Sequence, residues 1–190
     1  MRQLLLSLAL IPAVCIPAET NMCFRDTRAK AAYQYQQSQE KCLATMIYGE
    51  ARGEVKTGQV AVAYTALNRA VNRSVCDVIL APKQYSIFND NAELIATAKS
   101  PDKNPDLKNK IDEESWKTAV EVARLVMNKE VADPTNGSTH YLAPKVMKIK
   151  GYKYPKWSKQ YTLVAVINNH KFYKPYYPKK KKVDERVAAL

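Results

Sequence analysis

The sequence predicts a mainly helical α+β domain that ends in a small β-hairpin or sheet. Two segments, 42–54 and 58–71, are apolar enough to form buried helices, and a third, 112–129, is amphipathic with helical spacing. After residue 141 the composition shifts toward Tyr, Thr and Val, which favour strands. With 190 residues the chain is long enough for one domain with a sizeable core.

The chain begins with the layout of a secretory signal peptide. Arg2 precedes an apolar run over 4–14, and small residues with proline follow up to Ala18, where we expect cleavage. This run of about eleven residues is shorter than the roughly 20 that span a bilayer, so we expect export without a permanent membrane anchor. The polar, glutamine-rich segment 21–39 shows no clear periodicity, and we expect a loose lead-in or a short exposed helix.

The first buried helix has a glutamate near its end. Leu43, Ile47 and Glu50 are spaced i, i+4, i+7, so the carboxylate shares a stripe with two aliphatic side chains. Burial without a partner disfavours the ionised form and raises the pKa of a carboxyl group, which suits a general acid near neutral pH. The alternative is an ion pair between Glu50 and Arg52 or Arg69.

The second helix is expected to follow a break in the chain. Gly49 and Gly53 weaken the continuation of the helix on either side of Glu50. Thr57 then offers an N-cap for a helix over 58–71. Because apolar residues recur there at helical spacing, the two helices are expected to pack together as a core.

The segments after the second helix alternate between apolar runs and loops. A short apolar run at 75–80 precedes a loop with Pro and Asn at 81–91, and a brief helix is expected over 92–99. The helix over 112–129 has acidic residues in its first turn and a lysine in its last, as the helix dipole favours. Its expected buried face consists of Trp116, Val120, Ala123 and Met127.

A hairpin is the last predicted element. Asn136 and Gly137 mark a turn. Residues 161–173, YTLVAVINNHKFY, are typical of two strands that turn at Asn168 and Asn169.

Export changes the interpretation of the cysteines, because thiols pair more readily outside the cytosol. Cys15 lies in the predicted signal peptide, which leaves Cys23, Cys42 and Cys76. Cys42 begins the first buried helix and Cys76 follows the second, so we predict a disulfide between them, with Cys23 left over. The alternative is that the cysteines are buried and reduced. No CxxC is present and the two histidines are thirty residues apart, so we expect neither a metal nor another cofactor.

The excess positive charge is confined to the last third of the chain. Between Pro134 and Val183 there are twelve lysines and no acidic residue, and the other 18 basic residues balance the 18 acidic ones. A protein surface with this excess of positive charge favours a polyanionic partner: a cell-wall polymer, a membrane surface or nucleic acid. Solubility alone is the alternative, above all for the KKKK run. Because export separates the chain from most nucleic acid and no nucleic-acid motif is present, we expect no nucleic-acid partner.

Several separated segments resemble, in the right order, the SleB/CwlJ-type cell-wall hydrolase family. MIYGEARGE with GQVAVAYTALNRA is similar to the family's glutamate-bearing helix end, glycine turn and buried helix. VCDVI with KQYSIF, then GSTHYLAP and INNHKFY, resemble its later blocks, with Tyr85 where Phe is usual. The resemblance runs from about Cys42 to Tyr173, roughly two-thirds of the chain.

This resemblance implies a lysozyme-like fold and an enzyme that cleaves peptidoglycan glycan strands between N-acetylmuramic acid and N-acetylglucosamine. Glu50, the first glutamate of GEARGE, is then the catalytic acid. The candidate substrate-binding residues are Glu54, Gln84, Tyr85, Ser86, His140 and Tyr141. The expected organisation is a signal peptide (1–18), an N-terminal lead-in (19–39), a cell-wall hydrolase catalytic domain (40–175) and a basic C-terminal tail (176–190).

Some of these residues also have a purely structural interpretation. Gln84 and Ser86 suit hydrogen bonds to a saccharide, and Tyr85 could stack on a pyranose face. His140 suits a sugar hydroxyl, although a structural role is about as well supported, and His170 is interpreted as structural. Trp116 and Trp157 are interpreted as a core and a rim residue.

The number of carboxylates decides between reaction types. A glycosidase normally uses two, about 5 Å apart for retention or about 6.5 to 9.5 Å apart for inversion. A lytic transglycosylase needs only one, because the C6 hydroxyl of the muramyl sugar attacks internally and leaves a 1,6-anhydro product. Glu54 is a candidate second carboxylate, but Gly53 interrupts the helix between the two, so we favour the single-acid transglycosylase.

Three alternatives remain open. They are a hydrolytic muramidase, an N-acetylmuramoyl-L-alanine amidase, which commonly needs zinc, and a basic cell-wall-binding protein whose Glu50 is structural. We expect a monomer that acts on peptidoglycan in the periplasm, in the cell wall or outside the cell. The source is either a bacterium that remodels its own wall or a phage that lyses its host.

Overall fold

The computed structural model describes residues 14–15, 23–24, 26–89, 91–100 and 102–176. The predicted signal peptide at 1–18 lies outside these residues except for the backbone of Val14 and Cys15, and the predicted tail at 176–190 lies outside them except for Tyr176. Within the described part of the chain, no helix is long and apolar enough to cross a membrane. In chain order the elements are β1 (Val14–Cys15), β2 (Cys23–Phe24), α1 (Thr27–Ala51), α2 (Lys56–Arg69), α3 (Val75–Ile79), η1 (Ser86–Phe88), α4 (Ala92–Lys99), α5 (Lys110–Met127), β3 (His140–Leu142), α6 (Pro144–Ile149), η2 (Lys156–Lys159), β4 (Thr162–Ile167) and β5 (His170–Lys174).

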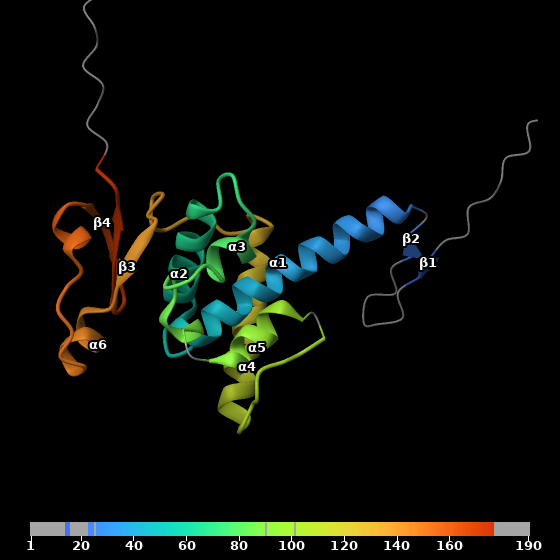
Figure 1. Ribbon diagram of the computed structural model, residues 1–190, viewed down its shortest axis with the longest axis horizontal. Helices are drawn as coiled ribbons and strands as arrows, with labels where there is room; N and C mark the ends of the chain where they lie inside the picture. Colours follow the sequence, from blue (N-terminus) through green and yellow to red (C-terminus); the bar gives the residue numbers. More distant parts are fainter. Residues whose placement is uncertain (1–13, 16–22, 25, 90, 101, 177–190) are drawn as a thin grey trace, which may run out of the picture.

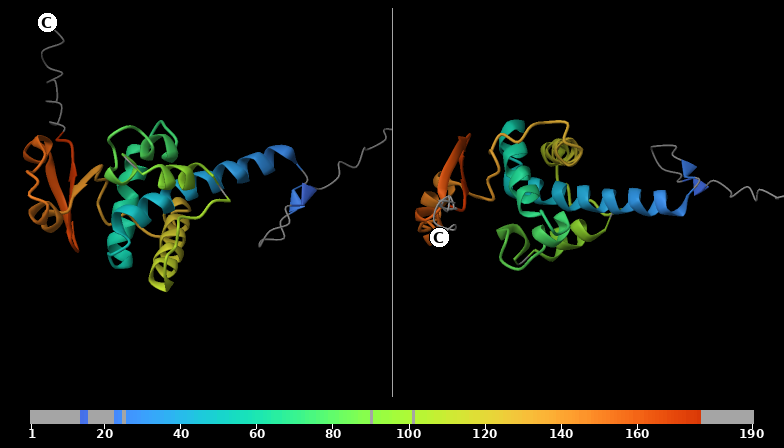
Figure 2. Two further views of the ribbon diagram at one scale, coloured as in Figure 1. Left: turned by 60° about the horizontal axis from the view of Figure 1, so that its bottom comes forward. Right: turned by 90° about the horizontal axis from the view of Figure 1, so that it is seen from above.

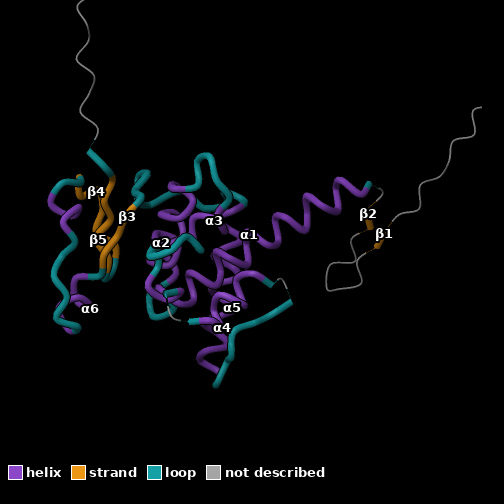
Figure 3. Tube along the Cα trace, viewed as in Figure 1, coloured by secondary structure: helices purple, strands orange, loops and turns teal. Residues whose placement is uncertain are grey.

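A group of helices forms the body of the protein, and a three-stranded antiparallel sheet lies at one end of it, beside α2 (Figures 1 and 3). The segment that contains α6 and η2 lies on the other side of the sheet, away from the helices (Figures 1 and 2). The two short strands β1 and β2 pair separately, near the start of α1. The predicted class, mainly helical α+β with a small sheet, is confirmed.

The central helix α1 starts much earlier than the sequence predicted. Asp26 caps it by accepting a hydrogen bond from the Arg28 N–H at 2.8 Å. The expected lead-in is therefore mostly the first half of α1, which extends away from the other helices (Figure 2). Its side chains are mostly exposed. Helix-forming residues such as Ala, Gln and Lys support this half without an apolar stripe, which is why periodicity does not reveal it.

The second half of α1 is the buried helix that the sequence predicted. Leu43 and Ile47 are fully buried, and α1 contacts α2, α3, α4 and α5. Tyr48 meets Trp116 edge to face with ring centroids 5.7 Å apart. The helix ends at Ala51, not at residue 54 as expected. Gly53 follows the C-cap residue Arg52, and its weak helix propensity explains the earlier end.

The other predicted helices are all present, and the ends of α2 and α5 differ from the prediction. α4 matches its expected bounds. α2 begins at Lys56, so Thr57 lies in its first turn and is not its N-cap. α5 begins at Lys110, because the Asn109 side chain accepts hydrogen bonds from the Ile111 and Asp112 N–H groups at 3.0 Å.

The buried face of α5 is also rotated relative to the expected one. Val120 is 44% exposed and Met127 is only partly buried. The buried positions are Trp116, Ala119, Val122, Ala123 and Val126. The two small alanines on this face leave room for α1 and α2, which both pack against it.

The predicted disulfide between Cys42 and Cys76 is present and joins α1 to α3. The sequence indicated only an apolar run at 75–80, and the structure forms the short helix α3 there. Ser74 caps it by accepting a hydrogen bond from the Asp77 N–H at 3.0 Å. The disulfide therefore connects the core helix α1 to the short helix α3.

The predicted hairpin is confirmed as β4 and β5, which turn at Asn168 and Asn169. The sequence did not predict that β3 would pair with β5, with His140 opposite Tyr173, and the strand order is β3-β5-β4. Gly58 lets the hairpin turn approach α2, because a Cβ at this position would lie 2.6 Å from the side-chain nitrogen Nδ2 of Asn168.

Candidate active site

A cleft of about 480 Å³ opens where the end of α1, the loop before α4 and the sheet meet. Glu50 is the only carboxylate among the described residues that line it. Of the other candidates from the sequence, five also line the cleft: Gln84, Tyr85, Ser86, His140 and Tyr141. Segments that are more than 90 residues apart in the chain thus meet around one acid.

Both oxygens of the Glu50 carboxylate have hydrogen-bond donors. The Tyr141 hydroxyl donates to Oε2 at 3.1 Å, and Ser86 Oγ donates to Oε1 at 3.3 Å. The Ile87 N–H also points at Oε1, with a longer distance of 3.4 Å. Neither Arg52 nor Arg69 forms an ion pair with Glu50 among the described residues, so the ion-pair alternative is wrong.

Gly49 explains why the loop donors reach Glu50. A Cβ at residue 49 would lie 2.3 Å from Cδ1 of Ile87, so only glycine allows η1 to pack this closely on the last turn of α1. The close approach places Ser86 and the Ile87 N–H beside the carboxylate. The glycine that was expected to weaken the helix therefore has a second role, in packing.

The strand β3 holds Tyr141 between Glu50 and the hairpin. Its ring lies 5.3 Å from the ring of His170 and 6.0 Å from that of Phe172. Burial raises the pKa of Tyr141 well above its usual value, and the neighbouring Glu50 carboxylate raises it further. The phenol therefore stays protonated at neutral pH and remains a hydrogen-bond donor to Glu50.

Asn68, in the sequence LNR at the end of α2, positions the turn before β3. Asn68 donates hydrogen bonds to the Asp133 carboxylate at 2.9 Å and to the Ser138 carbonyl at 3.0 Å. Burial raises the pKa of Asp133, but hydrogen bonds from Thr135, Asn68 and the Gly137 N–H outweigh it and hold the pKa below its usual value. An ionised aspartate thus ties α2 to the turn that leads to His140 and Tyr141.

Glu54 lies outside the cleft and contacts the hairpin. Its Oε1 accepts a hydrogen bond from Asn169 Nδ2 at 2.9 Å and lies 3.8 Å from His170 Nδ1. Its backbone carbonyl accepts a hydrogen bond from Gln59 at 3.0 Å. Burial lowers the pKa of His170, although Glu54 and Glu50 oppose this, so the imidazole is mainly neutral at pH 7. The contacts of Glu54 in this structure are those of a residue that anchors the hairpin.

The loop residues Gln84 and Tyr85 differ in exposure. Gln84 is exposed and accepts a hydrogen bond from the Arg69 guanidinium. Tyr85 is 4% exposed, and the Arg69 guanidinium lies 5.7 Å from its ring centroid. Its ring therefore lacks the free face that stacking on a sugar needs, so the proposed stacking role of Tyr85 is not supported. Burial raises the pKa of Tyr85, which keeps its phenol neutral.

An aromatic group forms the sheet side of the cleft. His140 lies 5.0 Å from Trp157 and 4.9 Å from Tyr161, measured between ring centroids, and its Nδ1 is 2.9 Å from Thr139 Oγ1. Burial lowers the pKa of His140, and the positive charge of Arg69 lowers it further, so the ring is mainly neutral at pH 7. Trp157 is partly exposed and lines the cleft, which makes it the better candidate for a sugar-stacking ring.

The structure adds cleft residues that sequence reasoning did not assign to the site. These are Thr65, Arg69, Lys83, Asn89, Thr139 and Trp157. Arg69 belongs to the LNR block and was considered only as an ion-pair partner. Within the described part of the chain, no three His, Cys, Asp or Glu side chains are grouped so that they could hold a metal ion.

The Tyr141 hydroxyl offers a direct test of the Glu50 environment. Tyr141→Phe is expected to lower kcat on soluble glycan strands roughly 10- to 100-fold, because a hydrogen bond to a charged group contributes about 1.5 to 3 kcal/mol. Tyr64→Phe is the matched control, since the Tyr64 hydroxyl bonds to the Val131 carbonyl outside the cleft. It should lower the melting temperature and leave kcat unchanged. Equal kcat values for Tyr141→Phe and the wild type would contradict the role of this donor.

A comparison with protein families agrees with the motifs that follow Glu50. A family model described as Cell Wall Hydrolase matches residues 53–173. Similar solved structures include the catalytic domain of the Bacillus cereus SleB protein, with 25% identity, a TM-score of 0.47 and coverage of 73% of this chain and 91% of that one. Another is the catalytic domain of the germination-specific lytic transglycosylase SleB from Bacillus anthracis, with 25% identity, a TM-score of 0.49 and coverage of 73% and 95%. A search of curated proteins finds no match.

Proposed function

Because the chain belongs to the cell wall hydrolase family, we propose that it degrades peptidoglycan by cutting the glycan strand as a lytic transglycosylase, with Glu50 as its single acid and base. The family expected from the sequence motifs is thereby confirmed. The observation that supports the single-acid mechanism is the position of Glu50, which is the only carboxylate among the described residues that line the cleft.

The proposed reaction uses Glu50 twice. Protonated Glu50 first gives its proton to the oxygen between the muramyl sugar and the next N-acetylglucosamine, and that bond breaks. The resulting carboxylate then accepts the proton of the muramyl C6 hydroxyl, whose oxygen bonds to C1 of the same sugar and closes the 1,6-anhydro ring. Glu50 is protonated again at the end, so no water is consumed.

The hydrogen-bond donors around Glu50 suit this cycle. After the first proton transfer, Tyr141, Ser86 and the Ile87 N–H all face the newly formed carboxylate. Fixed donors at a site where charge develops stabilise it without reorganisation. Glu54 does not line the cleft, and the hairpin residue Asn169 donates a hydrogen bond to its carboxylate, which supports the single-acid route.

The products released from purified sacculi test the proposal. Mass spectrometry of the released muropeptides should find 1,6-anhydromuramyl ends. Reducing muramyl ends would instead identify a hydrolytic muramidase, and free peptide stems on intact strands an amidase. A protein that pellets with sacculi and releases nothing would be a wall-binding protein without activity.

Wall binding is expected to depend on salt. The described segment 144–159 contains six of the twelve C-terminal lysines and no acidic residue, and neither α6 nor η2 has a buried residue. Because the Debye length falls from about 10 Å at 0.1 M to about 3 Å at 1 M salt, pelleting of the protein with sacculi should weaken over this range. Using Glu50→Gln for this assay keeps the sacculi intact.

Removal of residues 178–190 isolates the part of this binding that comes from the KKKK run. The truncated protein should pellet less at low salt and cleave short soluble glycans at the normal rate. Pelleting that is equal at every salt concentration and unaffected by the truncation would show that the lysines only solvate the surface.

A further inference from the structure

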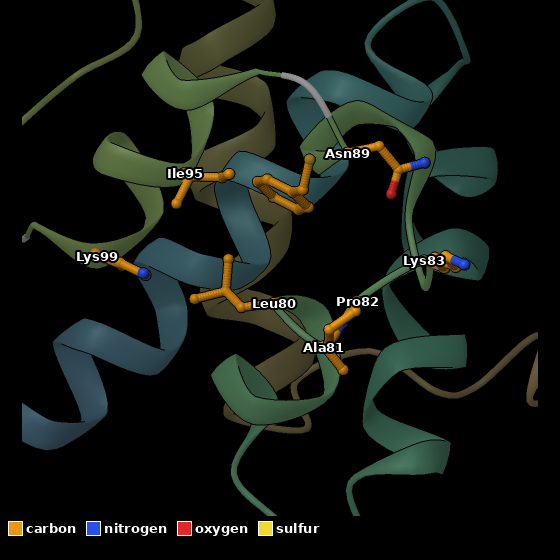
Figure 4. Close-up of a pocket in the computed structure, with 8 residues that line it drawn as sticks. Leu80, Ala81, Pro82, Lys83, Asn89, Ile95 and Lys99 are labelled. Carbon is orange, nitrogen blue, oxygen red and sulfur yellow. The ribbon is translucent and has the colours of Figure 1, made fainter.

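A second and larger pocket borders the cleft. Its volume is about 710 Å³, which is within the roughly 300 to 1,000 Å³ typical of small-ligand sites. It lies between the loop after α3 and the helix α4 (Figure 4). Lys83 and Asn89 line both the pocket and the cleft, so the two adjoin at these residues.

The pocket combines an apolar wall with positive charge. Leu80, Phe88 and Ile95 are among its apolar lining residues, and its charged residues are Lys83 and Lys99. Figure 4 shows the two lysines on opposite sides of the pocket. No acidic residue lines it within the described chain.

The backbone at Lys83 is unusual for a lysine. Its φ angle is 61°, in the left-handed region that a residue with a Cβ rarely adopts and that glycine or asparagine occupies more easily. Strained backbone of this kind concentrates at ligand-binding sites. Here the strain accompanies an exposed ammonium group at the junction of the pocket and the cleft.

We propose that this pocket binds the peptide stem attached to the muramyl sugar that is cleaved at Glu50. This rests on the proposed function. The stem is a short peptide with free carboxylates and small alkyl side chains, and it branches from the glycan strand at the muramyl lactyl group. Its carboxylates match Lys83 and Lys99, and its alkyl groups match the apolar wall.

The pocket does not suit the glycan strand itself. The sugars are polar and, where the lactyl group forms an amide with the stem, uncharged. They would leave both ammonium groups unpaired and would place hydroxyl groups against Leu80, Phe88 and Ile95. A branch that carries negative charge and apolar side chains satisfies both parts of the pocket.

Lys99 allows a clean test, because it lines the pocket and not the cleft. The two substrates are glycan strands with intact stems and the same strands after an amidase has removed the stems. Lys99→Gln is expected to lower kcat/KM about three- to five-fold on the strands with stems, as for one exposed charge pair. Lys99→Glu should lower it further, and both variants should cleave the bare strands like the wild type.

Two further variants complete the comparison. Lys83→Gly accommodates the left-handed backbone and removes only the side chain, so it should fold normally and lower the ratio of kcat/KM for stem-bearing over bare strands. Lys117→Gln, on the exposed surface of α5, is the matched control and should leave this ratio unchanged. Equal losses on both substrates, or no loss on either with Lys99→Glu, would overturn the stem pocket.

A binding measurement separates failure of this proposal from failure of the proposed function. A synthetic stem tetrapeptide should cause chemical-shift changes at pocket residues in an NMR titration of the wild type, and weaker ones with Lys99→Glu. Glycan cleavage without peptide binding would refute the stem pocket alone. If the wild type cleaves neither strand, the glycan-cutting function is refuted, and with it the assignment of this peptide.

Discussion

Replacing Glu50 by glutamine is expected to lower turnover on peptidoglycan by a factor on the order of 10² to 10⁴, the range typical of losing a general acid–base. Glutamine has nearly the same shape, and Tyr141, Ser86 and the Ile87 N–H can still donate hydrogen bonds to its carbonyl oxygen. It has no proton to give to the glycosidic oxygen, and it cannot accept one from the C6 hydroxyl. Release of soluble muropeptides from sacculi measures the effect.

Glu54→Gln is the matched control for this experiment. The amide oxygen of glutamine can still accept the hydrogen bond from Asn169, so the hairpin should remain in place. We expect a loss of activity much smaller than that of Glu50→Gln. A comparable loss would indicate a two-carboxylate mechanism, and the released ends would then be reducing. Near wild-type activity of Glu50→Gln would refute the assignment of the acid.

Removing the disulfide is expected to have the largest effect on stability. For a loop of this length, 34 residues in sequence separation, the chain-entropy model gives a loss of about 3 to 4 kcal/mol in the free energy of unfolding. The bridge also ties the one-turn helix α3 to α1, so its removal should loosen the loop that follows. The measurement is chemical denaturation of the oxidised wild type against a variant with Cys42→Ala and Cys76→Ala.

Reduction provides the internal control for the disulfide. Adding a reductant should destabilise the wild type by a similar amount and should leave the double alanine variant unchanged. A peptide map without reductant should recover the two cysteines in one linked fragment. If both thiols are free to alkylate in exported protein, the bridge is absent and the expected stability difference should vanish.

Glu50 and its neighbours show how much of the candidate site can be predicted from local sequence. Glu50 stands out because a charged residue follows two apolar ones at helical spacing, and Ser86 and Tyr141 stand out because their blocks resemble one family. All three meet in one cleft. Their mutual geometry depends on Gly49, whose missing side chain lets η1 reach α1, and sequence reasoning assigned this glycine only to the end of a helix.

The sequence by itself determined the buried half of α1, the helices α2, α4 and α5, the hairpin at Asn168 and the disulfide pair. Helical periodicity and turn residues are local features of the chain, and the two cysteines flank the two predicted core helices. The tertiary structure alone decided the position of Glu54, the pairing of β3 with β5, and the places of Arg69 and Trp157 in the cleft. These depend on contacts between residues far apart in the chain. The polar first half of α1 escaped detection for a different reason, since it is stabilised by backbone propensity and has no apolar stripe to mark it.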